Sequence, residues 1–182
     1  MEPGVILPLA LAALIAGAVA LFLQRASGAL RAARRVEQFQ QDAAQIGARL
    51  DALLGATIPR VDAVRRHELE ASAILEELDA AIATLDDELV RAQALTAPSA
   101  YTESRLGIVS EIGHAQRALA MVQHGCELTV APRARARATE SQIAIKRGYL
   151  NLLHAREALV RHVAGLTAPA DAVESSWRTF RV

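Results

Sequence analysis

The stretch ASAILEELDAAIATLDDELVRA, residues 71–92, decides the fold, because its apolar residues recur at alternating steps of four and three positions. This repeat places the apolar side chains on one face of a helix and favours lengthwise packing against another helix, knobs into holes. The repeat extends back to Val61 and is broken only at Glu68. Two further segments carry the same spacing, with Arg105 out of pattern in the second of them, and a last segment has a broader apolar stripe. Together they predict four helices packed lengthwise. The apolar residues of these three segments are Ala29, Ala32, Val36, Phe39, Ala43, Ile46, Leu50 and Leu53; then Tyr101, Ile108, Ile112, Ala115, Leu119, Val122 and Cys126; then Ile145, Tyr149, Leu152, Leu153, Leu159, Val160, Val163 and Leu166.

Prolines at nearly regular intervals mark the joints between these segments. They are Pro59, Pro98, Pro132 and Pro169. Proline is tolerated beside a helix or in its first turn but disrupts a helix interior. We expect Gly55 to be the left-handed cap at the first joint. Because short joints make neighbouring helices antiparallel, the sequence predicts an all-α fold with an elongated antiparallel four-helix (coiled-coil-like) bundle.

The composition of the chain fits one helical domain and excludes several classes of function. The chain has 182 residues, of which 52% are hydrophobic and 3% aromatic, and its formal net charge is zero. A general nucleic-acid binder needs a strongly basic face, so no nucleic-acid partner is expected. Cys126 is the single cysteine, which excludes an internal disulfide and a cage of thiolates around a metal.

The N-terminal residues predict a membrane anchor. Nineteen uncharged residues, Val5 to Leu23, follow a leader without Lys or Arg, and a helix of this length crosses a bilayer core of about 30 Å. A cleaved secretion signal is the alternative, but it needs a basic leader. The basic residues that follow the span are Arg25, Arg31, Arg34 and Arg35. Since basic residues stay on the cytoplasmic side, we expect a single-pass protein of the inner (plasma) membrane, with its N-terminus outside.

These features divide the chain into four predicted parts. Residues 1–4 form a short extracytoplasmic leader, residues 5–23 the transmembrane helix, residues 24–169 the cytoplasmic helical bundle, and residues 170–182 an amphipathic tail. In the tail, Val173, Trp177 and Phe180 fall on one face of a helix that starts with a capping box at Asp171. That apolar face is expected to rest on the end of the bundle or at a membrane interface. Since a dozen residues are marginal for an isolated helix, fraying of the tail is the alternative.

Charge is unevenly distributed along the predicted bundle. Acidic residues gather between Glu68 and Glu88, and basic residues between Arg133 and Arg161. One interpretation is that the second and fourth helices lie side by side or present solvated faces. The other is that the segment 133–137 contacts anionic lipid or an acidic partner. The candidate contact residues for membrane or partner are Arg25, Arg31, Arg34, Arg35, Arg133, Arg135 and Arg137.

No group of residues predicts a catalytic site. Glu111 and His114 have the Glu-x-x-His spacing of di-iron bundles, yet a second such pair is missing and the helical repeat turns His114 toward solvent. Cys126 falls on a core position, where a cysteine is a small packed hydrophobe. The sequence shows no phosphate loop or nucleophile elbow. We therefore predict no enzyme activity, no catalytic residues, no metal and no cofactor.

The C-terminal part of the bundle carries a string of residues found in a known family. The string is Thr139-Glu140-Ser141-Gln142-Ile143-Ala144, followed by Arg147, Tyr149 and Asn151. With Ile58-Pro59, His67-Glu68 and the overall layout, it resembles the LemA family of bacterial membrane proteins. In this chain Leu150 separates the Tyr and Asn that are adjacent in the family, and Phe39 is the aromatic residue nearest to the family's early Trp. The resemblance implies a short outside N-terminus, one membrane helix and a cytoplasmic helical bundle.

Together, the sequence features predict a membrane-anchored, non-enzymatic scaffold or adaptor of the LemA-like kind. Its partners are expected to be the membrane and either another protein or a second copy of the chain, with no small-molecule substrate. The alternative is a signal-sensing four-helix bundle that binds a small ligand. That class returns through the membrane in a second span, and no second apolar run of 18 or more residues occurs in the sequence.

Overall fold

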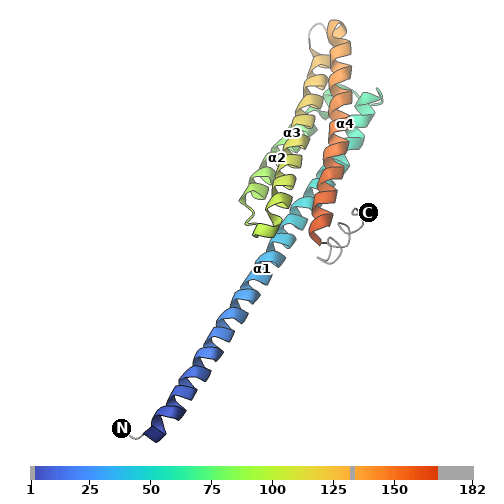
Figure 1. Cartoon of the computed structure of the whole chain (residues 1–182). Coiled ribbons are helices and arrows are strands. Elements are labelled where there is room, and N and C mark those ends of the chain that lie inside the picture. The colour runs from blue at the N-terminus through green and yellow to red at the C-terminus, as the bar shows by residue number, and fades with distance from the viewer. Residues whose placement is uncertain (1–2, 132–133, 168–182) are drawn as a thin grey trace, which may run out of the picture. The chain divides into compact units, whose positions relative to one another are not determined.

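A computed structural model of the chain describes residues 3–131 and 134–167, and every regular element in these ranges is helical. The predicted all-α fold is thereby confirmed, and four helices pack together (Figure 1). Two short 3-10 helices lie in the connections, η1 between α1 and α2 and η2 between α2 and α3. The elements are α1 (Pro3–Arg65), η1 (Ala71–Ile74), α2 (Leu75–Ala94), η2 (Ser99–Tyr101), α3 (Thr102–Val130) and α4 (Ala134–Thr167).

The chain divides into two compact units, Met1–Gln38 and Phe39–Val182. The backbone of the first unit is helical from Pro3 onward, as the beginning of α1. A search of the described residues found no helix with the length and hydropathy of a membrane span. Because the side chains of residues 5–16 and 18–23 lie outside the described part of the structure, the transmembrane helix stays a prediction from the sequence.

In the second unit the four helices form a ring of antiparallel neighbours. Each neighbouring pair is joined by contacts in which residue numbers rise on one helix while they fall on the other. The contacts are Arg49–Glu88 and Arg60–Glu77 between α1 and α2, Asp79–Gln123 and Asp86–Gln116 between α2 and α3, Gly107–His162 and Gly125–Ser141 between α3 and α4, and Gln40–Leu166 and Asp51–Arg156 between α4 and α1. This order confirms the antiparallel bundle that short joints predicted.

Most residues of the apolar stripes predicted from the sequence are buried or half-buried in the bundle, but Ala32 of α1 and Val160 of α4 are exposed, and the side chain of Ala29 lies outside the described part of the structure. Leu78 and Leu85 of α2 and the predicted stripe of α3 from Ile108 to Cys126 are buried. In α4 the buried residues recur every seven positions: Ile145, Leu152, Leu159 and Leu166. Val160, predicted as part of this stripe, is 49% exposed. It directly follows Leu159, and one helical step turns a side chain about 100° away from the core.

The first predicted joint is wrong, because α1 continues through Gly55 and Pro59 to Arg65. Proline removes one backbone hydrogen bond and costs about 3 kcal/mol in a helix interior. The residues beyond it outweigh that cost, since Ile58, Val61 and Val64 are all buried in the core and each fully buried side chain of this size contributes roughly 1.5–3 kcal/mol. The prediction of a left-handed Gly55 fails with the joint, since no described glycine has positive φ.

The first joint lies instead where the apolar repeat is broken, at Glu68. His67 has φ 61°, and its N–H donates to the Val64 carbonyl at 3.0 Å, while the Glu68 N–H donates to the Ala63 carbonyl at 2.8 Å. This pair of bonds is a Schellman cap, which satisfies the last carbonyls of α1. The displaced joint leaves α2 with 20 residues, shorter than the roughly 30 expected from the proline spacing.

The second and third joints lie near the prolines that predicted them. Pro98 lies between α2 and η2, and α3 ends at Val130 shortly before Pro132. Residues 132–133 and 168–182 lie outside the described residues. The last predicted joint, Pro169, and the tail at 170–182 fall in this part of the chain.

Candidate protein-interaction site

Helices α3 and α4 approach each other closely because glycines lie at their contact. An ideal Cβ on Gly148 would come 2.5 Å from Val122 Cγ2 and 2.8 Å from the Ala118 carbonyl oxygen. Further along, the buried Ser141 hydroxyl donates a hydrogen bond to the Gly125 carbonyl at 2.8 Å. Backbone therefore packs on backbone, and the outer faces of the two helices form one continuous surface.

A groove of about 600 Å³ runs along this surface between α3 and α4. Small side chains, Ala118, Ala155 and Ala158, line it and leave it open. Larger side chains of both signs surround them. From α3 these are Glu111, His114, Arg117 and Met121; from α4 they are Asn151, His154, Glu157 and Arg161. The groove therefore combines small apolar, charged and hydrogen-bonding side chains from two helices.

Within the groove, Glu111 and His114 bind each other. His114 Nδ1 lies 3.0 Å from Glu111 Oε2, and the His114 side chain is half-exposed. The prediction that His114 faces solvent is confirmed. Among the described residues, no three His, Cys, Asp or Glu side chains are arranged to hold a metal ion. Because the carboxylate of Glu111 is engaged by His114, the charges that remain toward solvent are those of Arg117, Arg161 and Glu157.

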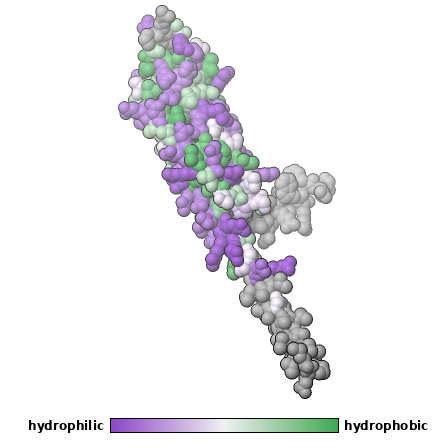
Figure 2. All heavy atoms as spheres, turned by 90° about the vertical axis from the view of Figure 1, so that its left-hand side faces the viewer, coloured by the Kyte–Doolittle hydropathy of each residue, from purple (hydrophilic) through white to green (hydrophobic). Residues whose placement is uncertain are grey.

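Exposed apolar residues extend the site along α4. Leu150 is 43% and Ile143 47% exposed, and they lie one and two heptads before Glu157 on the same helix face. Hydrophilic side chains cover most of the face of the bundle shown in Figure 2, with apolar patches between them. Protein interfaces are enriched in Met and Arg beside apolar side chains, and this is the composition that Met121, Arg117 and Arg161 give the groove.

The candidate contact residues predicted from the sequence lie in three places. The side chains of Arg25, Arg31, Arg34 and Arg35 are exposed on α1 in the first unit. Arg135 and Arg137 are exposed near the start of α4, at the end of the bundle opposite to Phe39. Arg133 lies outside the described residues. None of these residues lines the α3–α4 groove.

The Arg137 guanidinium forms an ion pair with the Glu140 carboxylate. Its Nε and Nη2 donate to the two Glu140 oxygens at 2.9 and 3.0 Å. This hydrogen bonding lowers the pKa of the Glu140 carboxyl and raises the pKa of Arg137, so the pair is ionised at neutral pH. An anionic lipid would have to compete with a carboxylate that already faces the guanidinium.

The acidic residues of α2 that form ion pairs bind arginines of α1 and α2, not of α4, and only Glu88 among them is buried. Glu88 is only 3% exposed, and its Oε1 lies 2.8 Å from Arg49 of α1 and 2.9 Å from Arg91 of α2. Glu77 pairs with Arg60 of α1. Among the described residues, no ion pair joins an acidic residue of the second helix to a basic residue of the fourth. The interpretation that these two helices lie side by side is therefore not supported.

Cys126 lies in the core, as predicted. Its side chain is fully buried, and desolvation raises the pKa of the thiol to about 11. At neutral pH the group is the protonated thiol, which is neither a nucleophile nor a metal ligand.

Sequence reasoning did not find the α3–α4 groove, because its charged residues are far apart in the sequence. Arg117 belongs to no charge run, Arg161 is only the last residue of the basic stretch 133–161, and antiparallel packing brings the two helix faces together. No family model matches this chain, and no curated protein or solved structure matches it either. The resemblance to the LemA family stays a prediction based on the residues quoted above.

Proposed function

We propose that the chain is a membrane-anchored, non-enzymatic scaffold or adaptor, LemA-like in layout, whose α3–α4 face binds another protein. The α3–α4 groove is the observation that carries this proposal. It is open and about 600 Å³ in volume, and exposed Ile143 and Leu150 extend it along α4. Small residues inside the groove leave room for a partner's side chains, while the charged residues around it fix the partner's orientation.

The charges of the face indicate the chemistry of the partner. Arg117 and Arg161 are exposed in the groove, and Arg147 is exposed on the stripe of α4 that also carries Arg161. Glu157 is the acidic residue of the groove that no described ion pair engages. A partner helix with acidic residues beside an apolar stripe complements this arrangement, with the acids meeting the arginines and the stripe covering Leu150.

The membrane anchor in this proposal is the apolar segment Val5–Leu23. Its sequence is long enough to cross a bilayer, and the arginines that follow it favour a cytoplasmic bundle. The helical backbone of α1 from Pro3 onward is compatible with such a span. The bundle would then present its α3–α4 face to cytoplasmic proteins near the inner membrane.

The alternative function is a signal-sensing bundle that binds a small ligand. The volume of the α3–α4 groove lies within the range of roughly 300–1,000 Å³ typical of small-molecule sites. This volume is the observation that supports a small ligand. Such sites are mostly apolar and enclose their ligand, whereas this groove has exposed His114, Arg117 and Arg161 around it. The scaffold explains these exposed charges better.

Site-specific photo-crosslinking in native membranes tests the scaffold. A photoreactive residue replaces His154 in the groove, and a control replaces Ala83, which is exposed on α2. We expect one defined protein adduct from position 154 and none from position 83. Arg161→Glu should lower the yield of that adduct several-fold, because it reverses a charge that meets the partner's acids.

Three outcomes would overturn the proposal. Equal adducts from positions 154 and 83 would mean that the contacts are nonspecific. Adducts with lipid alone would make the bundle a membrane-surface element. If no protein is captured and a small metabolite raises the thermal stability of the purified chain, the sensing alternative takes the place of the scaffold.

A further inference from the structure

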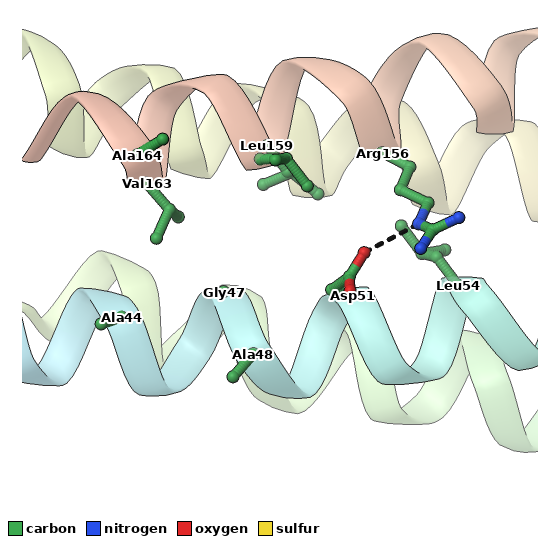
Figure 3. Close-up of a pocket in the computed structure, with 10 residues that line it drawn as sticks. Ala44, Gly47, Ala48, Asp51, Leu54, Arg156, Leu159, Val163 and Ala164 are labelled. Carbon is green, nitrogen blue, oxygen red and sulfur yellow. Dashed lines mark hydrogen bonds and ion pairs between the residues drawn. The ribbon is translucent and has the colours of Figure 1, made fainter. Parts of the chain in front are cut away.

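A second, apolar groove of about 310 Å³ lies between α1 and α4. Figure 3 shows Ala44, Gly47 and Ala48 on the α1 side, with Val163 pointing from α4 toward Gly47. Leu159 and the half-exposed Val160 also line the groove. An ion pair between Asp51 and Arg156, with Oδ1 and Nε 2.8 Å apart, crosses it at one end.

The other end of the groove lies beside the end of α4. The Gln40 side chain of α1 donates a hydrogen bond from Nε2 to the Leu166 carbonyl oxygen at 2.7 Å. Gln40 also lies one helical turn before Ala44 on α1. The last turn of α4 is therefore fixed to α1 next to the groove, and the chain that follows Thr167 starts at the groove's open end.

We propose that the chain's own C-terminal segment, Asp171 to Val182, packs into the α1–α4 groove as an amphipathic helix. The structure does not describe residues 168–182, and the proposal rests on their sequence and on the groove. α4 ends at Thr167, and in the sequence that follows, Pro169 disfavours a continued helix, while Asp171 and Glu174 have the spacing of a capping box that would start a new one. The residues 168–170 and the cap give a reversal within the usual length of helix–helix connections.

The segment and the groove match in length and in chemistry. Val173, Trp177 and Phe180 occur at positions i, i+4 and i+7, so they form one apolar stripe over about 10 Å of helix. The residues of α1 that line the groove run from Ala44 to Leu54, about 15 Å of helix, so the groove is long enough for this stripe. Val163 already packs over Gly47, where an added Cβ would lie 2.7 Å from Val163 Cγ2. The small side chains of Ala44 and Ala48 on either side leave space for aromatic rings, which bury large apolar areas.

Charge complements this register. A helix that starts beside Val163 and runs back along α4 brings its last turn, with Arg181, to the end of the groove at Asp51. The Asp51 side chain is 46% exposed despite its bond to Arg156, so its carboxylate accepts a second cation there. A partner helix from another protein lacks this fixed starting point, and the short connection gives the tail a high effective concentration at the groove.

The single tryptophan of the chain, Trp177, reports directly on this contact. The Trp177 fluorescence of the full chain is measured in lipid nanodiscs that hold one copy each. If the purified chain is soluble without lipid, the same measurement is made in buffer. We expect blue-shifted emission and weak quenching by acrylamide and by brominated acyl chains. Ala48→Glu places a charge in the groove at an exposed position, so it should shift the emission to the red and raise acrylamide quenching several-fold.

Ala83→Glu is the matched control, because Ala83 is also exposed but lies on α2, away from the groove. It should leave the Trp177 emission unchanged, and circular dichroism should show that both variants keep the helical content of the parent chain. Identical emission in the parent and Ala48→Glu would overturn the proposal. So would strong quenching by brominated lipid, which places the tail in the membrane, or a blue shift that needs two copies per nanodisc, which places it on a second chain.

Discussion

Leu85→Ala is expected to lower the free energy of unfolding of the bundle by about 2–5 kcal/mol. Leu85 is fully buried in the middle of α2, and Leu78 is buried two turns earlier on the same face. Removing three carbons there leaves a cavity between helices that are held at fixed spacing by ion pairs such as Arg49–Glu88. The surrounding side chains cannot collapse into the cavity, which places the loss within the range typical of rigid cores.

Urea unfolding of residues 28–182, followed by circular dichroism, measures this loss. Val90→Ala is the matched control, since Val90 lies on the same helix and is 65% exposed. A substitution at such a site changes stability by no more than about 0.5 kcal/mol. A loss below about 1 kcal/mol at Leu85, or equal losses at the two positions, would contradict the packing of α2.

Gly148→Ala is expected to destabilise the bundle by about 1–3 kcal/mol. The added Cβ would lie 2.5 Å from Val122 Cγ2 and 2.8 Å from the Ala118 carbonyl oxygen. A backbone oxygen cannot rotate aside as a side chain does, so α3 and α4 must separate along their whole contact. The same separation should distort the α3–α4 groove, and photo-crosslinking from position 154 should weaken with it.

Gly113→Ala separates this clash from the intrinsic effect of alanine in a helix. Gly113 lies on α3, and an added Cβ would meet only the Arg117 side chain of the same helix, with Nη1 at an ordinary 3.5 Å. Alanine is favoured over glycine in a helix by about 0.8–1.0 kcal/mol, so Gly113→Ala should stabilise the bundle. Close α3–α4 packing at Gly148 is ruled out if thermal or urea unfolding shows that both substitutions stabilise the bundle.

The apolar repeat predicted the core of the bundle but not the end of its first helix. Leu78, Leu85, Ile112 and Leu119 are buried where the repeat places them, because most of the stability of a helix in a protein comes from packing its apolar face. The joint predicted at Pro59 is wrong, because local helix propensity alone predicts a break there. The break at Glu68 marked the true joint, and His67 adopts there the left-handed conformation that was expected of Gly55.

The candidate sites were harder to predict than the core. His114 and His154 are distant in sequence and line one groove only because α3 and α4 are antiparallel and closely packed at Gly148. The close approach itself depends on glycines within the two helices. In a single sequence, a glycine inside a helical pattern is interpreted as destabilising and not as a packing contact. The run of basic residues at 133–137, in contrast, predicted Arg135 and Arg137 as contact residues, and both lie outside the groove.

The most direct test of the proposed anchored scaffold is the location of the C-terminus of the intact chain. Two reporters are fused after Val182, one active only in the cytoplasm and one active only after export, and the membranes are sedimented. Anchoring by residues 5–23, with Arg25, Arg31, Arg34 and Arg35 inside, predicts that the chain sediments with the membrane and that only the cytoplasmic reporter is active. Activity of the export-dependent reporter, or a chain that stays in the soluble fraction, would contradict it.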